Sequence, residues 1–391
     1  MDQSSSSQGV AQAARRAGLS LAPTGQSETE TSSVNPAALS LVTGTLLLAH
    51  ADETVPGDWK NAVDTLTRAL RIDASWVAAK QTDSLLEKAR RVVGSGAEDQ
   101  APVFAPWRVI SPTAFQMGQI SAAPPGAQWV VSYLFDFGPT CPTAVSPIDV
   151  ALMSPCPEVC FSDDAMVGPL PRMNTLATMV RAAASEGRTK LAIVVREAAR
   201  ATLATRLLAF DPSLNDASLE IEFVSIEDAV VRLQRGAPRW DGIIAMPDMR
   251  GIVFAMLAEA TDIKGPWPML WFDRGLRLVT SEAQTGATAS APLDATALMQ
   301  ALALLAKRSG RQYDAQRLYE CWAALRDSGI VTKARGSSAP YVNEIDEAAF
   351  IDHAVQDRSG NTRALPVWRA VAREQGEERA AQGPVRLSLV S

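Results

Sequence analysis

The stretch RWDGIIAMPDMRGIVFAMLAE, from Arg239 to Glu259, carries the clearest structural signal in this sequence. Its first part, Asp241–Met246, is a short apolar run, which predicts a buried strand. The residues from Pro247 onward predict a turn and then an apolar helix. The stretch therefore predicts one strand–turn–helix step of an α/β fold.

The sequence before this stretch repeats the same alternation of strand and helix patterns. Strands are expected at Ile148–Ser154, Lys190–Arg196 and Leu219–Ser225, and helices at Asn174–Gly187, Ala201–Asp211 and Ile226–Gly236. Alternation of this kind is typical of an α/β domain. Two further helices are expected at Asp294–Arg308 and Asp314–Gly329, after a loop rich in Gly, Thr and Ala.

The N-terminal third gives fewer signals. The apolar run Ala38–Ala51 predicts a buried strand and its approach, and Asp58–Ile72 has helical spacing of its apolar residues. A second short helix is expected at Asp83–Val93, with Asp83 as its N-cap. Residues 94–147 are rich in Gly, Pro and Ala and give no assignment.

Composition excludes some classes of protein. The chain has 391 residues, of which 47% are hydrophobic and 20% charged, as in ordinary globular proteins. A net charge of -6 and a pI near 5.2 give no electrostatic argument for nucleic-acid binding. No apolar run reaches the roughly 20 residues that a membrane-spanning helix needs.

The two ends of the chain differ from the middle in composition. Residues 1–37 are rich in Ser, Thr, Gln and Gly, and we expect a disordered tail there. Arg15 and Arg16 in an Ala-rich patch resemble an organelle presequence, which favours a mitochondrial location; an ordinary tail of a cytoplasmic protein is the alternative. Residues 356–391 are charged, and we expect a peripheral extension in which 367–381 could form an exposed helix.

Cysteine and histidine provide little material for a metal site or a catalytic triad. The cysteines are Cys141, Cys156, Cys160 and Cys321, which in so long a chain indicates a reducing compartment and buried free thiols. The histidines are only two, His50 and His353.

Several of these segments, in this order, resemble the isocitrate/isopropylmalate dehydrogenase family from roughly Leu41 to Val355. The resemblance is carried by HADETVPGDWKNAVDTL, SPIDVALMSPCPEVCFSD, EGRTKLAIVVREAA, DSGIVTK and NEIDEAAFIDHAV, and most closely by FVSIEDAVVRLQRGAPRWDGIIAMPDMRG. It implies an α/β fold with a mixed sheet and two domains around a substrate cleft. A generic doubly wound α/β protein is the alternative.

The resemblance also implies domain boundaries. The large domain combines residues 38–133 with 265–355, and the smaller domain comprises 134–264 and holds the cleft and the dimer helix. Residues 1–37 and 356–391 lie outside both domains.

The family's reaction needs arginines for the substrate carboxylates and a Lys/Tyr pair for proton transfer. The position matching a catalytic Arg is Ser154, and no Arg or Lys occurs between Arg108 and Arg172. The Tyr position is Phe161, which lacks the proton. The Lys position is Arg196, which cannot act as a base because it stays protonated; Arg196 could equally be a solvated cation at a strand end.

The family's metal and nucleotide sites are also changed. The three metal carboxylates match Glu227, Ile252 and Met256, and Ile and Met supply no oxygen ligand for Mg²⁺ or Mn²⁺. Glu227 with its neighbour Asp228 resembles an acidic helix start more than a ligand pair. The nucleotide loop matches 279–292, which keeps Gly286 and Pro292 but has no His; a flexible connector is the simpler interpretation. We therefore expect no metal and no cofactor.

These changes predict a non-catalytic family member with a structural or regulatory role in a protein assembly, alone as a homodimer or beside an active paralogue. An active NAD-dependent oxidoreductase or decarboxylase with an altered site is the alternative. A third hypothesis is a small-molecule sensor that uses the remnant cleft. A thermal-shift screen with nicotinamide nucleotides, 2-hydroxy acids and divalent metals discriminates among them.

The helix after the metal turn, Gly251–Ala260, is the predicted partner surface, since in the family this helix packs against its mate in the dimer. It is apolar nearly all round, and such a helix should be buried on more than one side. Ile252, Phe254, Met256 and Leu257 would each stabilise an interface by roughly 1.5–3 kcal/mol if fully desolvated. The segment matching the family's dimer arm, Asp163–Met173, is short. The alternative is a core helix of a monomer.

Overall fold

A single eleven-stranded sheet runs through the protein. The computed structural model describes residues 45–50, 54–78, 101–117, 123–137, 147–162, 166–216, 219–235, 239–263, 265–284, 291–333, 342–356, 364–372 and 387–389. In spatial order the strands are β15 (Leu387–Leu389), β9 (Glu220–Ser225), β8 (Lys190–Val195), β10 (Gly242–Ala245), β5 (Ile148–Pro155), β4 (Trp129–Asp136), β11 (Trp267–Phe272), β12 (Leu276–Glu282), β3 (Val103–Ile110), β1 (Leu46–His50) and β2 (Ala74–Ala78).

The sheet is mixed, and its direction changes in the middle. Neighbouring strands from β15 to β5 are parallel, and those from β12 to β2 are parallel as well. Between these two parallel parts, β5, β4, β11 and β12 pair antiparallel. The antiparallel strands β4 and β11 therefore join the two halves of the molecule.

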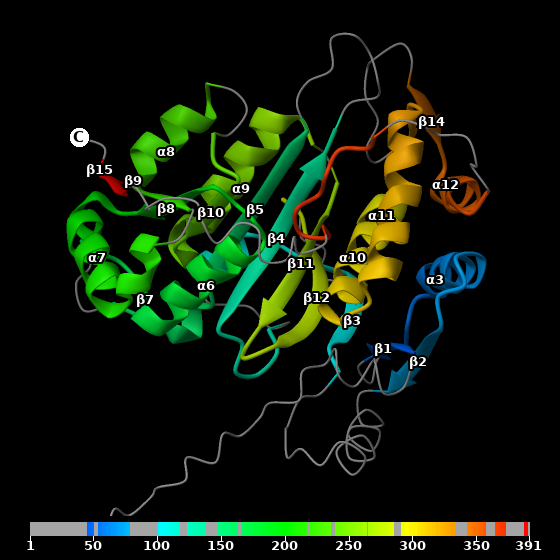
Figure 1. Ribbon diagram of the computed structural model, residues 1–391, viewed down its shortest axis with the longest axis horizontal. Coiled ribbons are helices and arrows are strands. Elements are labelled where there is room, and N and C mark those ends of the chain that lie inside the picture. The colour runs from blue at the N-terminus through cyan, green and yellow to red at the C-terminus, as the bar shows by residue number, and fades with distance from the viewer. Residues whose placement is uncertain are drawn as a thin grey trace, which may run out of the picture.

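Helices pack on both faces of the sheet. They are α3 (Gly57–Ala69), α5 (Thr113–Met117), α6 (Met173–Ser185), α7 (Glu197–Phe210), α8 (Ile226–Leu233), α9 (Pro247–Thr261), α10 (Ala295–Arg308), α11 (Gln312–Asp327) and α12 (Glu347–Ala354). In Figure 1, α8 and α9 lie on one side of strands β8 and β10, and α6 and α7 lie on the other. The pairs β6 (Cys160–Phe161) with β7 (Leu170–Pro171) and β13 (Ile330–Thr332) with β14 (Asn343–Ile345) form two small separate sheets.

This architecture confirms the α/β fold class with a mixed sheet. The expected strands and helices from residue 148 to residue 261 all form, although α7 begins at Glu197, four residues earlier than expected. The segment 94–147, which gave no assignment, contains β3, α5 and β4 in its described part. The sheet is continuous across the predicted domain boundary near residue 264, so the division into two domains stays a prediction.

Strand β4, all eight residues of which are buried, was missed because its apolar run lies in a segment rich in Gly, Pro and Ala, without the alternating strand and helix patterns that mark β5, β8, β9 and β10. A strand with both faces covered has no alternation of polar and apolar residues, and periodicity alone cannot identify it. Its Phe135 packs against Trp368 with ring centroids 5.2 Å apart, and Trp129 stacks on Phe272 at 4.3 Å.

The expectation of a peripheral C-terminal extension is wrong for residues 364–372. Trp368 is 1% exposed and contacts Tyr133, Phe135 and Tyr319. The described part of the predicted helix forms a turn, in which the amides of Val371 and Ala372 donate to the carbonyl of Trp368, and Gln312 Nε2 donates to the carbonyl of Val371 at 2.7 Å. The aromatic anchor makes this segment part of the core.

Some sequence expectations fall outside the described residues. These are the tail 1–37, the helix Asp83–Val93 and the thiol of Cys141. Among the described helices, none combines the length and the hydropathy needed to cross a membrane.

Candidate functional site

In open α/β sheets, ligands bind beyond the carboxyl ends of the strands, at the point where the strand order reverses. In this sheet that point lies at the carboxyl ends of β5, β8 and β10. Ser154 lies near the end of β5, Arg196 directly follows β8, and α9 begins directly after β10. The structure therefore brings residues that the sequence had placed in separate motifs to one edge of the sheet.

Ser154 is fully buried and holds a cation from another part of the chain. The hydroxyl oxygen of Ser154 accepts a hydrogen bond of 2.9 Å from Nη1 of Arg250, in the first turns of α9. The same Nη1 donates to the carbonyl of Leu152 at 3.3 Å. An arginine side chain from a different place in the sequence thus lies beside Ser154, the residue that the family resemblance pairs with a catalytic Arg.

The hydrogen-bond donors of the Arg250 guanidinium all bind groups inside the protein. Its Nε and Nη2 donate to the two carboxylate oxygens of Glu282 at 2.8 and 2.6 Å, and both side chains are fully buried. Nη2 also donates to the hydroxyl of Ser132 at 2.8 Å, and that hydroxyl donates to Glu282. The guanidinium lies 4.8 Å from the centre of the Phe115 ring. We call Ser132, Ser154, Arg250 and Glu282 the buried arginine cluster.

The buried arginine cluster joins the two halves of the sheet. Ser154 and Arg250 come from β5 and α9, whereas Glu282 ends β12 on the other side of β4 and β11. A bidentate arginine–carboxylate pair has strict geometry, and removing one partner leaves a buried charge without compensation. The cluster therefore fixes the position of α9 relative to β12.

Arg196 is neither a base nor a fully solvated cation. It forms an ion pair with Asp248 at the start of α9, with Nη2 2.8 Å from Oδ2, and its side chain is about half-buried. The guanidinium end of Arg196 lies over Gly168, where a Cβ atom would come within 2.8 Å of Nε. Gly168 has a φ of +76°, a backbone conformation that favours glycine.

Phe161 lies in β6 and is 51% exposed. The guanidinium of Arg172 lies 5.3 Å from the centre of its ring, which is a cation–π distance. The described part of the predicted short dimer arm, Asp163–Met173, contains β7, which pairs with β6 directly before the arm.

The three positions that match metal carboxylates do not form a ligand set. Glu227 is exposed in the first turn of α8, where the Ser225 hydroxyl accepts a hydrogen bond from the amide of Asp228, as expected for an acidic helix start. Ile252 is 43% exposed and Met256 is partly buried. Within the described part of the chain, no group of three His, Cys, Asp or Glu side chains could hold a metal ion.

Half of the predicted partner surface on α9 is wrong. Phe254 and Leu257 are buried inside the chain, where Phe254 lies 4.1 Å, centre to centre, from Trp267. Because both side chains are enclosed by the chain itself, they cannot contact a partner. Ile252 is 43% exposed, and Met256 is partly buried and packs against the core, so Ile252 is the residue of the predicted set with the most surface left for a partner.

Carboxylates cap the start of α10, where the nucleotide loop of the resembled family would end. Asp294 Oδ1 accepts a hydrogen bond from the amide of Ala297 at 2.7 Å, and Glu347 Oε2 accepts one from the amide of Ala295 at 2.7 Å. Free amides at a helix start attract phosphate, whereas two carboxylates repel it. Pro292 is exposed just before this cap, and Gly286 lies outside the described residues.

A second, partly buried polar network joins the halves at the opposite end of β5. Glu186, which ends α6, accepts hydrogen bonds from Arg308 of α10 at 2.6 Å and from the hydroxyl of Tyr133. Burial, reinforced by the charge of Glu186, raises the pKa of Tyr133, which keeps this hydroxyl a donor. The amide of Arg369 in the C-terminal segment donates to Asp149 of β5 at 2.9 Å.

The free thiols match the sequence expectation in part. Cys156 is buried, whereas Cys160 and Cys321 are partly buried. Burial, and then the nearby carboxylates of Asp248 and Glu158, raise the pKa of the Cys160 thiol to about 12.

Arg250 and Glu282 were not predicted as site residues from the sequence. Each is a charged residue within an apolar segment: Arg250 in MRGIVFAML and Glu282 at the end of LRLVTSE. A charge at a position that should face the core is the signal that could have identified them, since buried charges are paired.

Comparison with known proteins gives matches in structure but not in sequence. No protein-family model matches this chain, and no curated protein matches it by sequence. The TT0538 protein from Thermus thermophilus matches with a TM-score of 0.51 and 14% identity, over 84% of this chain and 72% of that one. A chain in the peripheral stalk of the Euglena gracilis mitochondrial ATP synthase matches with a TM-score of 0.53 and 14% identity, over 79% of this chain and 98% of that one.

An isocitrate dehydrogenase from Methylococcus capsulatus is also among the matches, with a TM-score of 0.48 and 13% identity, over 80% of this chain and 98% of that one. These likenesses are likenesses of fold. At such identities they assign no activity to this chain.

Proposed function

We propose that this protein is a non-catalytic structural subunit of a larger protein assembly. The observation that carries the proposal is the bidentate Arg250–Glu282 ion pair, fully buried at the carboxyl end of β5. Family resemblance implies that substrate carboxylates would bind an arginine there. In this chain the arginine at that place is already saturated by Glu282, Ser132 and Ser154.

The polar networks at both ends of β5 support a rigid role. Enzymes that bind substrate between two halves often close around it, which requires the halves to move. Here Arg250–Glu282 ties the halves at one end of β5, and Glu186–Arg308 ties them at the other. Residues 366–372 add a third tie, since Tyr319 and Gln312 bind this segment from one half and Asp149 from the other.

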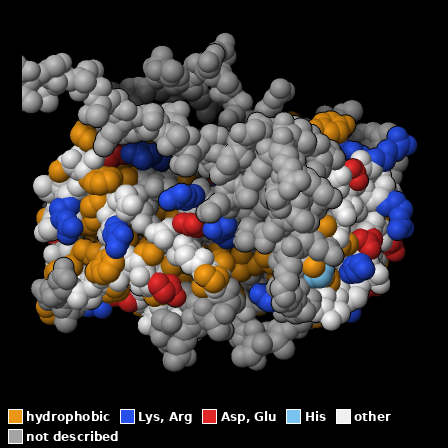
Figure 2. Space-filling model, turned by 90° about the horizontal axis from the view of Figure 1, so that it is seen from below, with side chains coloured by type: hydrophobic (Ala, Val, Ile, Leu, Met, Phe, Trp, Pro, Cys, Tyr) orange, Lys and Arg blue, Asp and Glu red, His pale blue; other side chains and the backbone are white. Residues whose placement is uncertain are grey.

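The structural neighbour from Euglena gracilis suggests which kind of assembly this could be. That protein is part of the peripheral stalk of a mitochondrial ATP synthase, and this chain aligns with nearly all of the matched chain. We propose a comparable setting: a mitochondrial assembly in which this fold serves as a scaffold. On the face shown in Figure 2, hydrophobic side chains are exposed among basic and acidic ones, and such side chains are available for contact with neighbouring subunits.

The test is the native state of the protein in its own cells. The protein, tagged at its natural abundance, should migrate in a stable large complex on a native gel and copurify with a fixed set of subunits. ATP synthase subunits among them would support the peripheral-stalk setting. Migration as a free monomer or homodimer would contradict the structural role.

A parallel test addresses the catalytic alternative. The purified protein is screened by thermal shift with nicotinamide nucleotides, isocitrate, isopropylmalate and Mg²⁺. The proposal expects no saturable stabilisation by any of them. Stabilisation by nucleotide and acid together, with nicotinamide reduction, would favour an active oxidoreductase instead; stabilisation without turnover would favour a sensor.

A further inference from the structure

A polar pocket of about 550 Å³ lies at the amino ends of strands β8 and β9, opposite to the carboxyl ends that form the candidate site. It is lined by Lys190, Glu220, Glu222, Arg232, Arg235, Arg239 and Trp240. Lys190 and Glu220 are the first residues of the parallel strands β8 and β9. The pocket is therefore distinct from the edge where Ser154 and Arg196 lie, since those residues are at the carboxyl ends of their strands.

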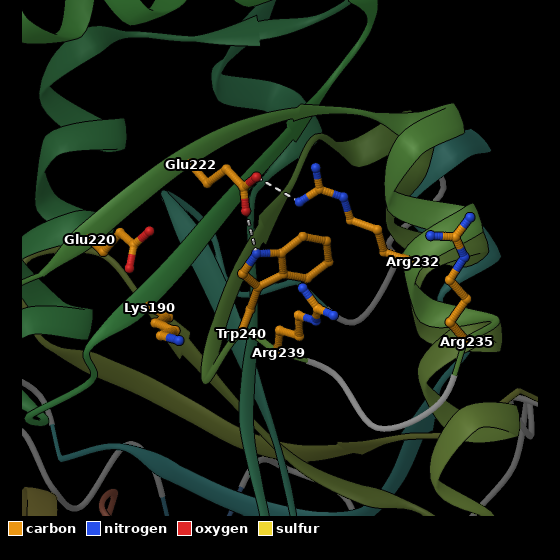
Figure 3. A pocket seen from close by; sticks show the side chains of 7 residues that line it. All are labelled: Lys190, Glu220, Glu222, Arg232, Arg235, Arg239 and Trp240. Atoms are coloured by element: carbon orange, nitrogen blue, oxygen red, sulfur yellow. Dashed lines mark hydrogen bonds and ion pairs between the residues drawn. The ribbon is translucent and has the colours of Figure 1, made fainter. Parts of the chain in front are cut away.

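One wall of the pocket is fixed by its own contacts. Glu222 Oε1 accepts a hydrogen bond of 2.6 Å from Nη1 of Arg232, and Oε2 accepts one of 2.8 Å from Nε1 of Trp240 (Figure 3). The guanidinium of Arg232 also lies 5.7 Å from the centre of the Trp240 ring. The charge of Glu222 is thus balanced by Arg232 and is not available to a ligand.

The remaining charges of the pocket are mainly positive. Lys190, Arg235 and Arg239 are exposed and form no ion pair with any described residue, and Glu220 is the remaining carboxylate of the lining. Among the described residues, three cations without an ion-pair partner thus line the pocket with one such carboxylate, on a protein whose net charge is -6. Like charges held together repel each other, and a bound anion relieves this repulsion.

Two of these cations, Lys190 and Arg235, lie next to backbone segments that are fixed by hydrogen bonds and an ion pair. The carboxylate of Asp241 accepts hydrogen bonds from the amides of Thr189 and Lys190 at 2.8 and 2.9 Å, which fixes the start of β8. Arg235 follows the last turn of α8, whose end is set by the Arg232–Glu222 ion pair. Lys190 and Arg235 thus extend from anchored segments.

We propose that this pocket binds a small polyanion that carries phosphate groups. Arginine forks bind phosphate through paired hydrogen bonds, and lysine adds a point charge. The volume lies within the range of small-molecule pockets, about 300–1,000 Å³. The pocket is independent of the proposed structural role, because its residues take no part in the buried arginine cluster.

The test is isothermal titration calorimetry of the full chain with inorganic pyrophosphate. We expect one site per chain, with an affinity that falls as salt concentration rises, because the contacts are ionic. The double substitution Arg235→Gln with Arg239→Gln should weaken binding at least about tenfold, since two arginine–phosphate contacts are lost. Arg274→Gln, an exposed arginine outside the pocket, is the matched control and should leave binding unchanged.

Two results would overturn the proposal: no heat beyond dilution with pyrophosphate, or an equal loss of binding in Arg274→Gln and in the double variant. A binding experiment with vesicles that contain a phosphoinositide distinguishes a lipid headgroup from a soluble molecule as the natural ligand. Vesicle binding that pyrophosphate displaces, and that the double variant loses, assigns the phosphate groups to a lipid headgroup. Pyrophosphate binding without vesicle binding assigns them to a soluble molecule.

Discussion

Arg250 and Glu282 form a bidentate ion pair in which both side chains are inaccessible to solvent. The two residues are 32 positions apart, in α9 and at the end of β12, and the hydroxyls of Ser132 and Ser154 complete the hydrogen bonding of the guanidinium. The pair connects the two halves of the sheet. A shift of one half relative to the other would break this pair, and would therefore lower the stability of the folded chain.

Arg250→Met should destabilise the protein by about 3–5 kcal/mol, because it leaves the Glu282 carboxylate buried without a partner. Urea denaturation followed by circular dichroism measures this. The control Arg277→Gln removes a more exposed cation, paired with Asp273 at 3.6 Å, and should cost about 0–1 kcal/mol. The double variant Arg250→Met with Glu282→Leu should be more stable than Arg250→Met alone. Equal losses in Arg250→Met and Arg277→Gln would contradict the role of the pair.

No single substitution toward the catalytic residues of the resembled family should produce dehydrogenase activity. Phe161→Tyr, Arg196→Lys and Ile252→Asp each supply one member of a set that works as a unit, and such effects are strongly non-additive. The assay is nicotinamide reduction with isocitrate or isopropylmalate. Detectable turnover in any one of the three variants would refute this expectation.

Calorimetry with Mg²⁺ and Mn²⁺ should give only heats of dilution. Ile252 and Met256 supply no oxygen ligand, and Glu227 is exposed in the first turn of a helix. A micromolar metal site that Glu227→Gln abolishes would show that the interpretation of these positions is wrong.

The two sides of α9 should respond differently to a charge. Ile252→Asp, on the exposed side, should release soluble and folded chains if this side contacts a partner, as light scattering would detect. Phe254→Asp, on the buried side, should unfold the domain, since even Phe→Ala at a core position costs about 3–5 kcal/mol. Tyr313→Asp, an exposed aromatic residue on α11, is the control for surface charge. If Ile252→Asp and Tyr313→Asp leave the same assembly, α9 is not an interface.

Thiol alkylation should be slow in the folded protein. Burial raises the pKa of Cys160 to about 12 and raises that of Cys156 as well, so both remain thiols at neutral pH, and the thiolate is the reactive form. Because these pKa values are raised, the alkylation rate should keep increasing with pH past about 8.5, where an ordinary thiol levels off. Peptide mapping after iodoacetamide treatment measures each cysteine, with the denatured chain as reference. A plateau near the ordinary pKa for Cys160 would contradict the burial effect.

The sequence by itself determined the α/β fold class and the strands and helices from Ile148 to Thr261. These elements could be predicted because their signals are local: within about ten residues a helix shows its hydrophobic periodicity, and a buried strand shows a short apolar run between turn residues. The sequence also determined which chemical groups these positions lack, since Phe161 has no hydroxyl proton, and Ile252 and Met256 have no oxygen ligand for Mg²⁺, wherever they lie.

Only the tertiary structure decided what fills the candidate site. The Arg250–Glu282 pair joins residues whose contact depends on the order of strands β5, β4, β11 and β12, and no local pattern encodes that order. The same holds for Trp368, whose charged surroundings in sequence hide its place in an aromatic core. Burial on both faces removed the periodicity of β4, and burial of a paired charge depends on a partner distant in sequence. Both effects are properties of the packed chain and not of any segment alone.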